Sequence, residues 1–227
     1  MPLRSMLEIV NVKKEIPSQF ESVAKFSDTI TTEDRISYVS LIFPHHKDVN
    51  PIIHELIKNN ICHQTYTGAL STTPQNGSGN RHIEEIDKLF SWIEDSLSDC
   101  VDKLAVNSGS IYNASPETYK SIYTTSPEVF KNFKIAEYWG MFYPMGSGAT
   151  SHTHFPYPIS FAYYVNVPKG SSPFTLDGND ISVEDGMLIV FAGDMYHEVK
   201  KSKCEERSML SGNVIFVPNI PEQSSWE

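Results

Sequence analysis

Cysteine is scarce in this sequence. The chain has 227 residues and three cysteines, Cys62, Cys100 and Cys204, and no two of them are close in sequence. An odd number without short spacing disfavours a disulfide framework and favours a reducing compartment. Because no Cys-x-x-Cys pair occurs, a zinc site built from thiolates is disfavoured as well.

Long apolar runs and an excess of positive charge are also missing. No stretch approaches the ~20 apolar residues that cross a bilayer, and the N-terminus has no apolar targeting segment. We therefore expect a cytoplasmic protein that does not enter the membrane. The formal net charge is −10, which makes nucleic acid an unlikely partner because its phosphates attract basic surfaces. Glycine-rich nucleotide-binding motifs are absent, which disfavours nucleotide enzymes.

The remaining composition is that of an ordinary globular protein. Hydrophobic residues make up 40% of the chain and charged residues 20%, which is enough apolar chain to bury a core. We expect a single domain over residues 1–227. Within it, residues 1–132 should form a mixed helical and strand cladding, and residues 133–217 a β-rich core.

The N-terminal part carries weak strand signals and two helix signals. Short strands are expected at 7–12 and 38–43. Asn50 followed by Pro51 predicts a helix that begins there, with Asn as the N-cap. A longer helix is predicted over about 81–105, where apolar residues recur every three or four positions. Residues 70–80 are polar and glycine-containing and predict a loop, and prolines after Ser115 and Ser126 predict short helical turns.

The residue composition of the C-terminal part is typical of an antiparallel β structure. Runs rich in β-branched and aromatic residues are separated by Gly, Pro, Asn and Asp. The predicted fold class is therefore mixed α+β, an antiparallel sandwich or barrel with N-terminal helices packed on the sheet. The predicted strands are 133–143, 159–167, 174–176, 187–192 and 209–217.

Three histidines in this part form a candidate metal site. His152 and His154 are two residues apart in an extended segment, so their side chains point to the same side. His197 follows the buried-looking strand at 187–192. Imidazole is a good ligand for Fe, Zn, Cu and Ni, and Arg207 comes ten residues after the last histidine.

In this order the residues resemble the double-stranded β-helix, or jelly roll, of the iron(II)- and 2-oxoglutarate-dependent oxygenases. The resemblance covers roughly residues 133–217 and is greatest to an oxygenase family known mainly from sequence. It rests on Tyr138-Trp139-Gly140, Gly146, His152-Thr153-His154, Ser160 to Val165, Val167-Pro168, Gly186 to His197, Arg207 and Asn213.

The resemblance implies a dioxygenase, a hydroxylase of unknown substrate, that uses Fe(II), 2-oxoglutarate and O₂. His152, His154 and His197 would be the metal ligands. Arg207 would bind the distal carboxylate of 2-oxoglutarate, a role that suits a planar guanidinium. The residues expected to assist it at the co-substrate are Tyr138, Tyr143, Tyr164 and Asn213. A homodimer is compatible with the sequence.

The sequence departs from the superfamily pattern at the second ligand, which is usually Asp or Glu and here is His154. Either His154 binds the metal in a three-histidine set, or a carboxylate such as Asp177 or Asp194 completes the site. A second departure is Met209, where the superfamily often has Ser.

Two other function classes fit part of the pattern. A cupin that uses three histidines without 2-oxoglutarate has similar glycine and histidine spacings, but it has no need of a carboxylate anchor at Arg207. A non-catalytic jelly-roll binding module would need no metal at all. Bound metal and bound 2-oxoglutarate distinguish the three classes.

Overall fold

The computed structural model of the chain describes residues 38–76, 83–108 and 132–217. The strand expected at 7–12 and the turns expected after Ser115 and Ser126 lie outside these residues. Within them, the elements are β1 (Tyr38–Ile42), α2 (His46–Asn59), β2 (Ile61–Gln64), β3 (Leu70–Thr72), β4 (Gln75–Asn76), α3 (Glu84–Ser108), β5 (Phe133–Tyr143), β6 (Ala149–His152), β7 (Ile159–Asn166), β8 (Phe174–Leu176), β9 (Asn179–Ile181), β10 (Met187–Ala192), β11 (His197–Val199) and β12 (Arg207–Phe216).

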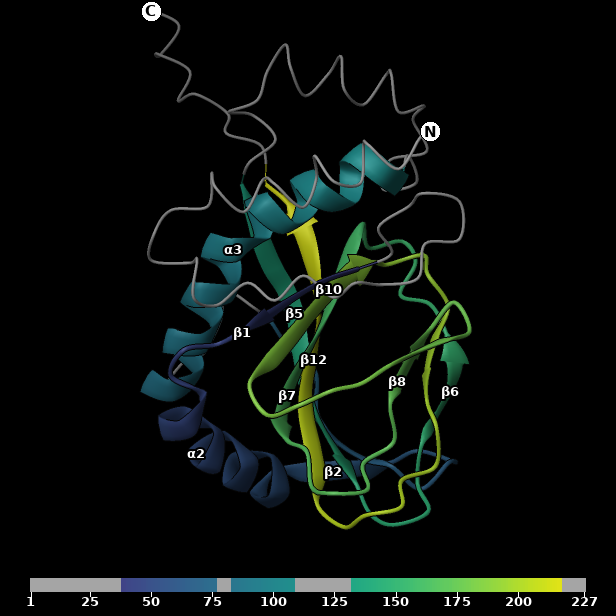
Figure 1. Cartoon of the computed structure of the whole chain (residues 1–227). Coiled ribbons are helices and arrows are strands. Elements are labelled where there is room, and N and C mark those ends of the chain that lie inside the picture. The colour runs from purple at the N-terminus through teal and green to yellow at the C-terminus, as the bar shows by residue number, and fades with distance from the viewer. Residues whose placement is uncertain (1–37, 77–82, 109–131, 218–227) are drawn as a thin grey trace, which may run out of the picture.

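The strands form two antiparallel sheets. The larger has eight strands in the order β1-β10-β7-β12-β5-β3-β2, with β4 added beside β5. The smaller has four strands in the order β6-β11-β8-β9. Figure 1 shows α2 and α3 on one side of the large sheet and β6 and β8 on the other. The expectation of a mainly antiparallel, sheet-rich fold is confirmed.

The central strands of the large sheet are buried on both faces. Along β7, Phe161, Tyr163 and Val165 belong to the core that includes the helices, whereas Ala162 and Tyr164 belong to the core beneath the small sheet. Side chains alternate between the faces of a strand, so a strand covered on both sides reads as an unbroken apolar run. This explains the continuous apolar run at 161–165.

The first helix begins earlier than the sequence predicted. Helix α2 starts at His46, and Asn50 lies inside it as a buried residue. The Asn50 side chain donates to the carbonyl oxygen of Val165 at 2.7 Å and accepts from the Tyr163 hydroxyl at 2.6 Å. The prediction of Asn50 as N-cap was wrong because this side chain binds α2 to β7. Residues 70–72 and 75–76 are strands, so the loop predicted over 70–80 was wrong there as well.

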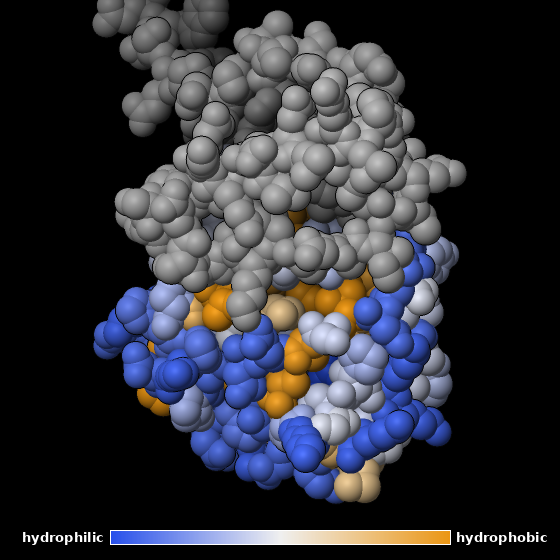
Figure 2. Space-filling view, in the orientation of Figure 1, coloured by the Kyte–Doolittle hydropathy of each residue, from blue (hydrophilic) through white to orange (hydrophobic). Residues whose placement is uncertain are grey.

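Helix α3 covers the same face of the large sheet. Phe90 is fully buried, and its ring centre lies 4.5 Å from that of Tyr138 on β5 and 6.3 Å from that of Phe161 on β7. No helix among the described residues is both long and apolar enough to cross a membrane. In the space-filling view, hydrophilic side chains cover most of the described surface, and hydrophobic ones gather in a strip near the middle (Figure 2).

We predict that Phe90→Ala lowers the free energy of unfolding by about 3–5 kcal/mol, because it removes a buried aromatic ring and leaves a cavity. Chemical denaturation would measure this change. The control is Lys88→Ala on the exposed side of α3, which should change stability by less than about 0.5 kcal/mol. A loss below 1 kcal/mol for Phe90→Ala would contradict the packing of α3 on the sheet.

Candidate metal and co-substrate site

Two of the candidate ligands face each other across the small sheet. His152 ends β6 and His197 begins β11, and the two are paired residues in the antiparallel register. His152 is exposed, whereas His197 is buried. The pairing follows from the antiparallel register because both residues lie at the same end of adjacent strands. It places the two rings with their centres 4.3 Å apart.

His154 reaches the same place from the loop that follows β6. Its backbone N–H donates to the carbonyl oxygen of Gly193 at 2.7 Å, which ties this loop to the turn before His197. The backbones approach so closely that a Cβ at Gly193 would collide with the carbonyl oxygen of Tyr157. Only glycine fits here, so Gly193 allows the loop that carries His154 to lie against the turn that carries His197.

The ring nitrogens of the three histidines converge. One nitrogen of each lies within 4.8 Å of the others, and the Nε2 atoms of His152 and His154 are 3.3 Å apart. Ligands at right angles around a metal, about 2.0–2.1 Å from it, lie about 3 Å from each other. The spacing therefore suits a single metal ion.

In each ring, one nitrogen points away from the other two histidines, and its hydrogen bond determines which nitrogen faces them. His152 Nδ1 lies 2.7 Å from the carbonyl oxygen of Thr150, and His197 Nδ1 lies 3.0 Å from that of Met195. A carbonyl oxygen only accepts, so in both rings Nδ1 carries the proton and Nε2 keeps its lone pair. His154 Nδ1 lies 2.7 Å from Asn213 Oδ1 in the same arrangement. Metal-binding histidines use their second nitrogen in this way.

Burial keeps two of these rings neutral. It lowers the pKa of His197 to about 3, and together with the neighbouring His152 it lowers the pKa of His154 to about 4. Both imidazoles are therefore uncharged at pH 7, the form that binds a metal.

Arg207 begins β12 and is completely buried. Its Nη1 donates to the backbone carbonyl oxygen of Ser172. No hydrogen bond of ordinary geometry reaches its Nε and Nη2 or the hydroxyl of Tyr164 among the described residues, and the only interaction of that hydroxyl is a weak one with the guanidinium itself. Buried donors without an acceptor cost stability, so Nε and Nη2 of Arg207 leave room for an acceptor from a bound molecule.

Two tyrosines flank the guanidinium. Arg207 Cζ lies 5.5 Å from the ring centre of Tyr143 and 5.4 Å from that of Tyr164. Burial raises the pKa of Tyr143 to about 12 and raises that of Tyr164 as well, against the opposing effect of the guanidinium. Both hydroxyls therefore stay protonated at pH 7 and are available as donors.

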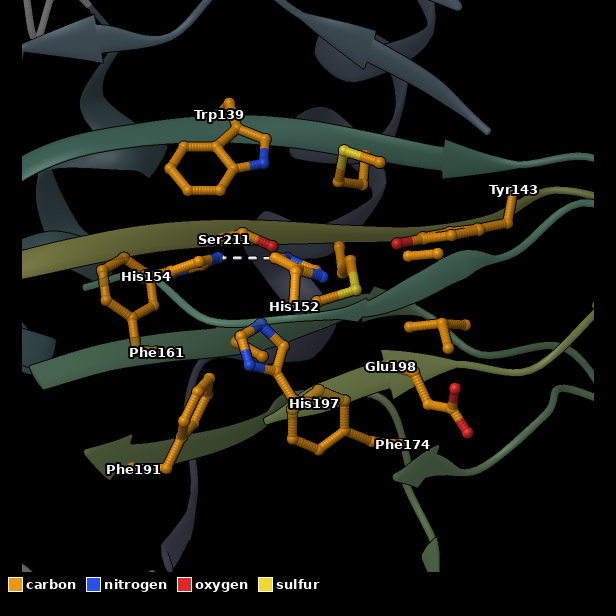
Figure 3. Close-up of a pocket in the computed structure, with 15 residues that line it drawn as sticks. Trp139, Tyr143, His152, His154, Phe161, Phe174, Phe191, His197, Glu198 and Ser211 are labelled. Atoms are coloured by element: carbon orange, nitrogen blue, oxygen red, sulfur yellow. Dashed lines mark hydrogen bonds between the residues drawn. The ribbon is translucent and has the colours of Figure 1, made fainter. Parts of the chain in front are cut away.

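A cavity of about 60 Å³ is lined by the three histidines and extends to Tyr143, whereas Arg207 and Tyr164 do not line it. Tyr143, Met141 and Met209 line it together with the three histidines (Figure 3). Glu198 lines it too, but Figure 3 shows its carboxylate directed away from the histidine rings. Methionine side chains are unbranched and repack readily, so the cavity is bordered by adaptable groups.

The structure does not bring every candidate residue to this cavity. Tyr138 lies on the opposite face of the large sheet, against Phe90. Asn213 contacts His154 and not the Arg207 region. Asp177 and Asp194 are exposed and do not belong to the cluster of potential ligands.

Two residues behind His154, Ser160 and Glu137, were not among the predicted site residues. Ser160 Oγ lies 3.0 Å from His154 Nδ1, and Glu137 accepts from the side chain of Asn213. The available signal was a polar residue inside an otherwise apolar strand, which fits Ser160 on β7 but not Glu137. A buried polar side chain in such a strand needs a partner.

An open groove of about 730 Å³ adjoins the cavity and shares His152, Trp139 and Met141 with it. Many of its lining residues bear hydroxyl groups, among them Thr65, Thr67, Ser71 and Thr73. The groove thus gives access from solvent to the exposed side of His152.

No family model matches the sequence, and no curated protein is similar to it. Solved structures do share its fold. The viral collagen prolyl hydroxylase of Paramecium bursaria Chlorella virus-1, in a complex with 2-oxoglutarate, is 10% identical with a TM-score of 0.53, over 82% of this chain and 99% of that one. A Trichoplax adhaerens prolyl hydroxylase bound to a hypoxia inducible factor peptide is 13% identical with a TM-score of 0.53, over 94% and 93%.

A third similar structure is that of an enzyme with a different reaction, an epimerase. The non-heme alpha ketoglutarate dependent epimerase SnoN from nogalamycin biosynthesis is 8% identical with a TM-score of 0.54, over 85% of this chain and 88% of that one. At such low identity the likeness shows the fold alone. The chain has the jelly-roll fold of the 2-oxoglutarate- and iron(II)-dependent oxygenases.

Proposed function

We propose that this protein is an iron(II)- and 2-oxoglutarate-dependent oxygenase that hydroxylates its substrate. The observation that carries the proposal is the convergence of one ring nitrogen from each of three histidines at one end of a cavity. The Nε2 atoms of His152 and His154 are 3.3 Å apart. Lone pairs that face each other without a proton between them repel unless a cation lies among them. His152, His154 and His197 would hold that cation.

Arg207 supports 2-oxoglutarate as the co-substrate. Its free Nε and Nη2 and the free Tyr164 hydroxyl form a buried donor set beside the cavity. A carboxylate accepts such donors in a fork-like arrangement, with short charge-assisted hydrogen bonds. Met141 and Met209 would repack to admit the chain of the dicarboxylate.

Bound together, iron, 2-oxoglutarate and O₂ would supply the oxidation of a substrate C–H bond. The chain's own residues would bind and orient the reactants. Arg207, with Tyr164 and Tyr143, would hold the distal carboxylate, and the aromatic and methionine side chains would keep bulk water from the cavity. The groove beside His152 would bind the substrate.

The donor set at Arg207 also favours this function over a cupin. A three-histidine cupin does not require a co-substrate carboxylate at this position, whereas the distal carboxylate of 2-oxoglutarate would supply an acceptor for the two free nitrogens of the buried guanidinium. The described lining of the groove includes Glu137 and no lysine or arginine, which favours a neutral or cationic substrate. A true substrate with a phosphate on its reacting unit would contradict that part of the proposal.

The third ligand can be tested directly. We expect His154→Ala to weaken metal binding by more than about 100-fold, beyond the loss typical for a residue that only supports a ligand. Asp177→Ala and Asp194→Ala should leave the affinity unchanged because both residues are exposed. Equilibrium dialysis with Fe(II) under anaerobic conditions would measure all three. Normal affinity in His154→Ala together with a loss in either aspartate variant would overturn the three-histidine site.

The co-substrate anchor has a separate test. We expect Arg207→Gln to weaken 2-oxoglutarate binding by roughly 2–5 kcal/mol, at least about thirtyfold, because a buried charged donor is lost. Calorimetry with Mn(II)-loaded protein would measure it, and Mn(II) affinity itself should not change. Lys203→Gln, which removes an exposed cation, is the matched control. If the wild type binds no 2-oxoglutarate, the proposal fails and the cupin alternative replaces it.

A further inference from the structure

We propose that Glu137 and Asn213 act as positioning residues that fix which nitrogen of His154 faces the metal. The inference rests on the metal site of the proposed function but not on its co-substrate. His152 and His197 each use a nearby backbone carbonyl as the partner of Nδ1. For His154, side chains from the large sheet take that place.

The hydrogen bonds form a chain with one consistent direction. Asn213 Nδ2 donates to Glu137 Oε1 at 2.8 Å, and Asn213 Oδ1 lies 2.7 Å from His154 Nδ1. A carboxylate only accepts, so it holds the amide nitrogen of Asn213 toward itself. The amide oxygen must then face His154, and because this oxygen also only accepts, Nδ1 of His154 carries the proton.

Ser160 supports the same arrangement. Its hydroxyl donates to Asn213 Oδ1 at 2.8 Å, and both residues are buried. With two donors at its oxygen and the Glu137 carboxylate at its nitrogen, the Asn213 amide cannot turn over without placing its own oxygen against that carboxylate. Away from water such a network is strong when complete and costly when incomplete.

The strand register explains why this network is rigid. Asn213 on β12 is the paired residue of Glu137 on β5 and of Ser160 on β7. The three residues therefore form one polar row across three neighbouring strands. His154 lies on a loop, which is less constrained than a strand, and the row gives it a fixed support.

The polar row also brings a negative charge close to a histidine site that has no carboxylate ligand. His154 stands where the oxygenases it resembles usually have a carboxylate ligand. Glu137 lies behind it, separated by one amide, and a carboxylate at the end of such a chain raises the basicity of the imidazole. We infer that Glu137 returns part of the missing negative charge to the three-histidine site.

The test compares three variants of the full chain. Asn213→Leu removes the amide at similar volume, and Glu137→Gln keeps the shape but removes the charge and the acceptor-only character. Ser208→Ala is the matched control, since Ser208 is a buried polar residue on the same strand whose hydroxyl contacts His54 and which does not line the cavity. Nitrogen-15 NMR of the histidine rings in metal-free protein reports the tautomer of His154.

We expect His154 to carry its proton on Nδ1 in the wild type and in Ser208→Ala. In Asn213→Leu the Nε2-protonated form should appear, and Fe(II) affinity should fall by about 10- to 100-fold. Glu137→Gln should show both effects to a smaller extent. If Asn213→Leu does not fold, Glu137→Gln tests the inference in its place. An unchanged tautomer and unchanged affinity in the folded variants would overturn the inference.

The outcome is independent of the proposed co-substrate. If the wild type binds metal but no 2-oxoglutarate, the oxygenase function fails while the tautomer result still decides the role of Asn213. If the tautomer is unaffected while 2-oxoglutarate binds normally, only the inference about Glu137 and Asn213 fails.

Discussion

The site depends on three imidazole lone pairs that point into one small space. Each ring gives its Nδ1 proton to an oxygen behind it, so no proton remains between the Nε2 atoms of His152 and His154 at 3.3 Å. Such an arrangement is unfavourable when empty and favourable around a cation. The metal proposal thus follows from hydrogen-bond directions as much as from distances.

The large sheet makes this arrangement possible because each of its two faces packs in a different hydrophobic core. Its helix-facing side packs on α2 and α3, and its other side carries Arg207, Met209, Ser211 and Asn213 along β12. These four residues alternate with helix-facing ones such as Leu210. One strand therefore carries Arg207, the proposed co-substrate anchor, and Asn213, the proposed support of His154, with Met209 and Ser211 of the cavity lining between them.

Much of this could be predicted from the sequence, because strand composition and histidine spacing are local properties. The strands at 133–143, 174–176 and 187–192 were predicted with the observed bounds. The role of Asn50 could not be predicted, since its partners on β7 are more than a hundred residues away and the pairing depends on the tertiary fold.

Two of the candidate co-substrate residues could have been excluded by strand geometry. Tyr138 and Tyr143 are an odd number of residues apart on β5, so they face opposite sides of the sheet, and only one can reach the cavity. Asn213 shares a face with Arg207, but six residues of strand span about 20 Å. Both side chains could not reach the same carboxylate. The third ligand stayed open because spacing alone cannot place Asp177 or Asp194 relative to the histidines.

The most direct test of the account is a crystal structure of the protein grown with Fe(II) and 2-oxoglutarate under anaerobic conditions, with diffraction data above and below the iron absorption edge. The account predicts one iron peak bound by Nε2 of His152, His154 and His197, and a dicarboxylate whose distal end contacts Arg207. Iron bound elsewhere, or a dicarboxylate that does not touch Arg207, would contradict it.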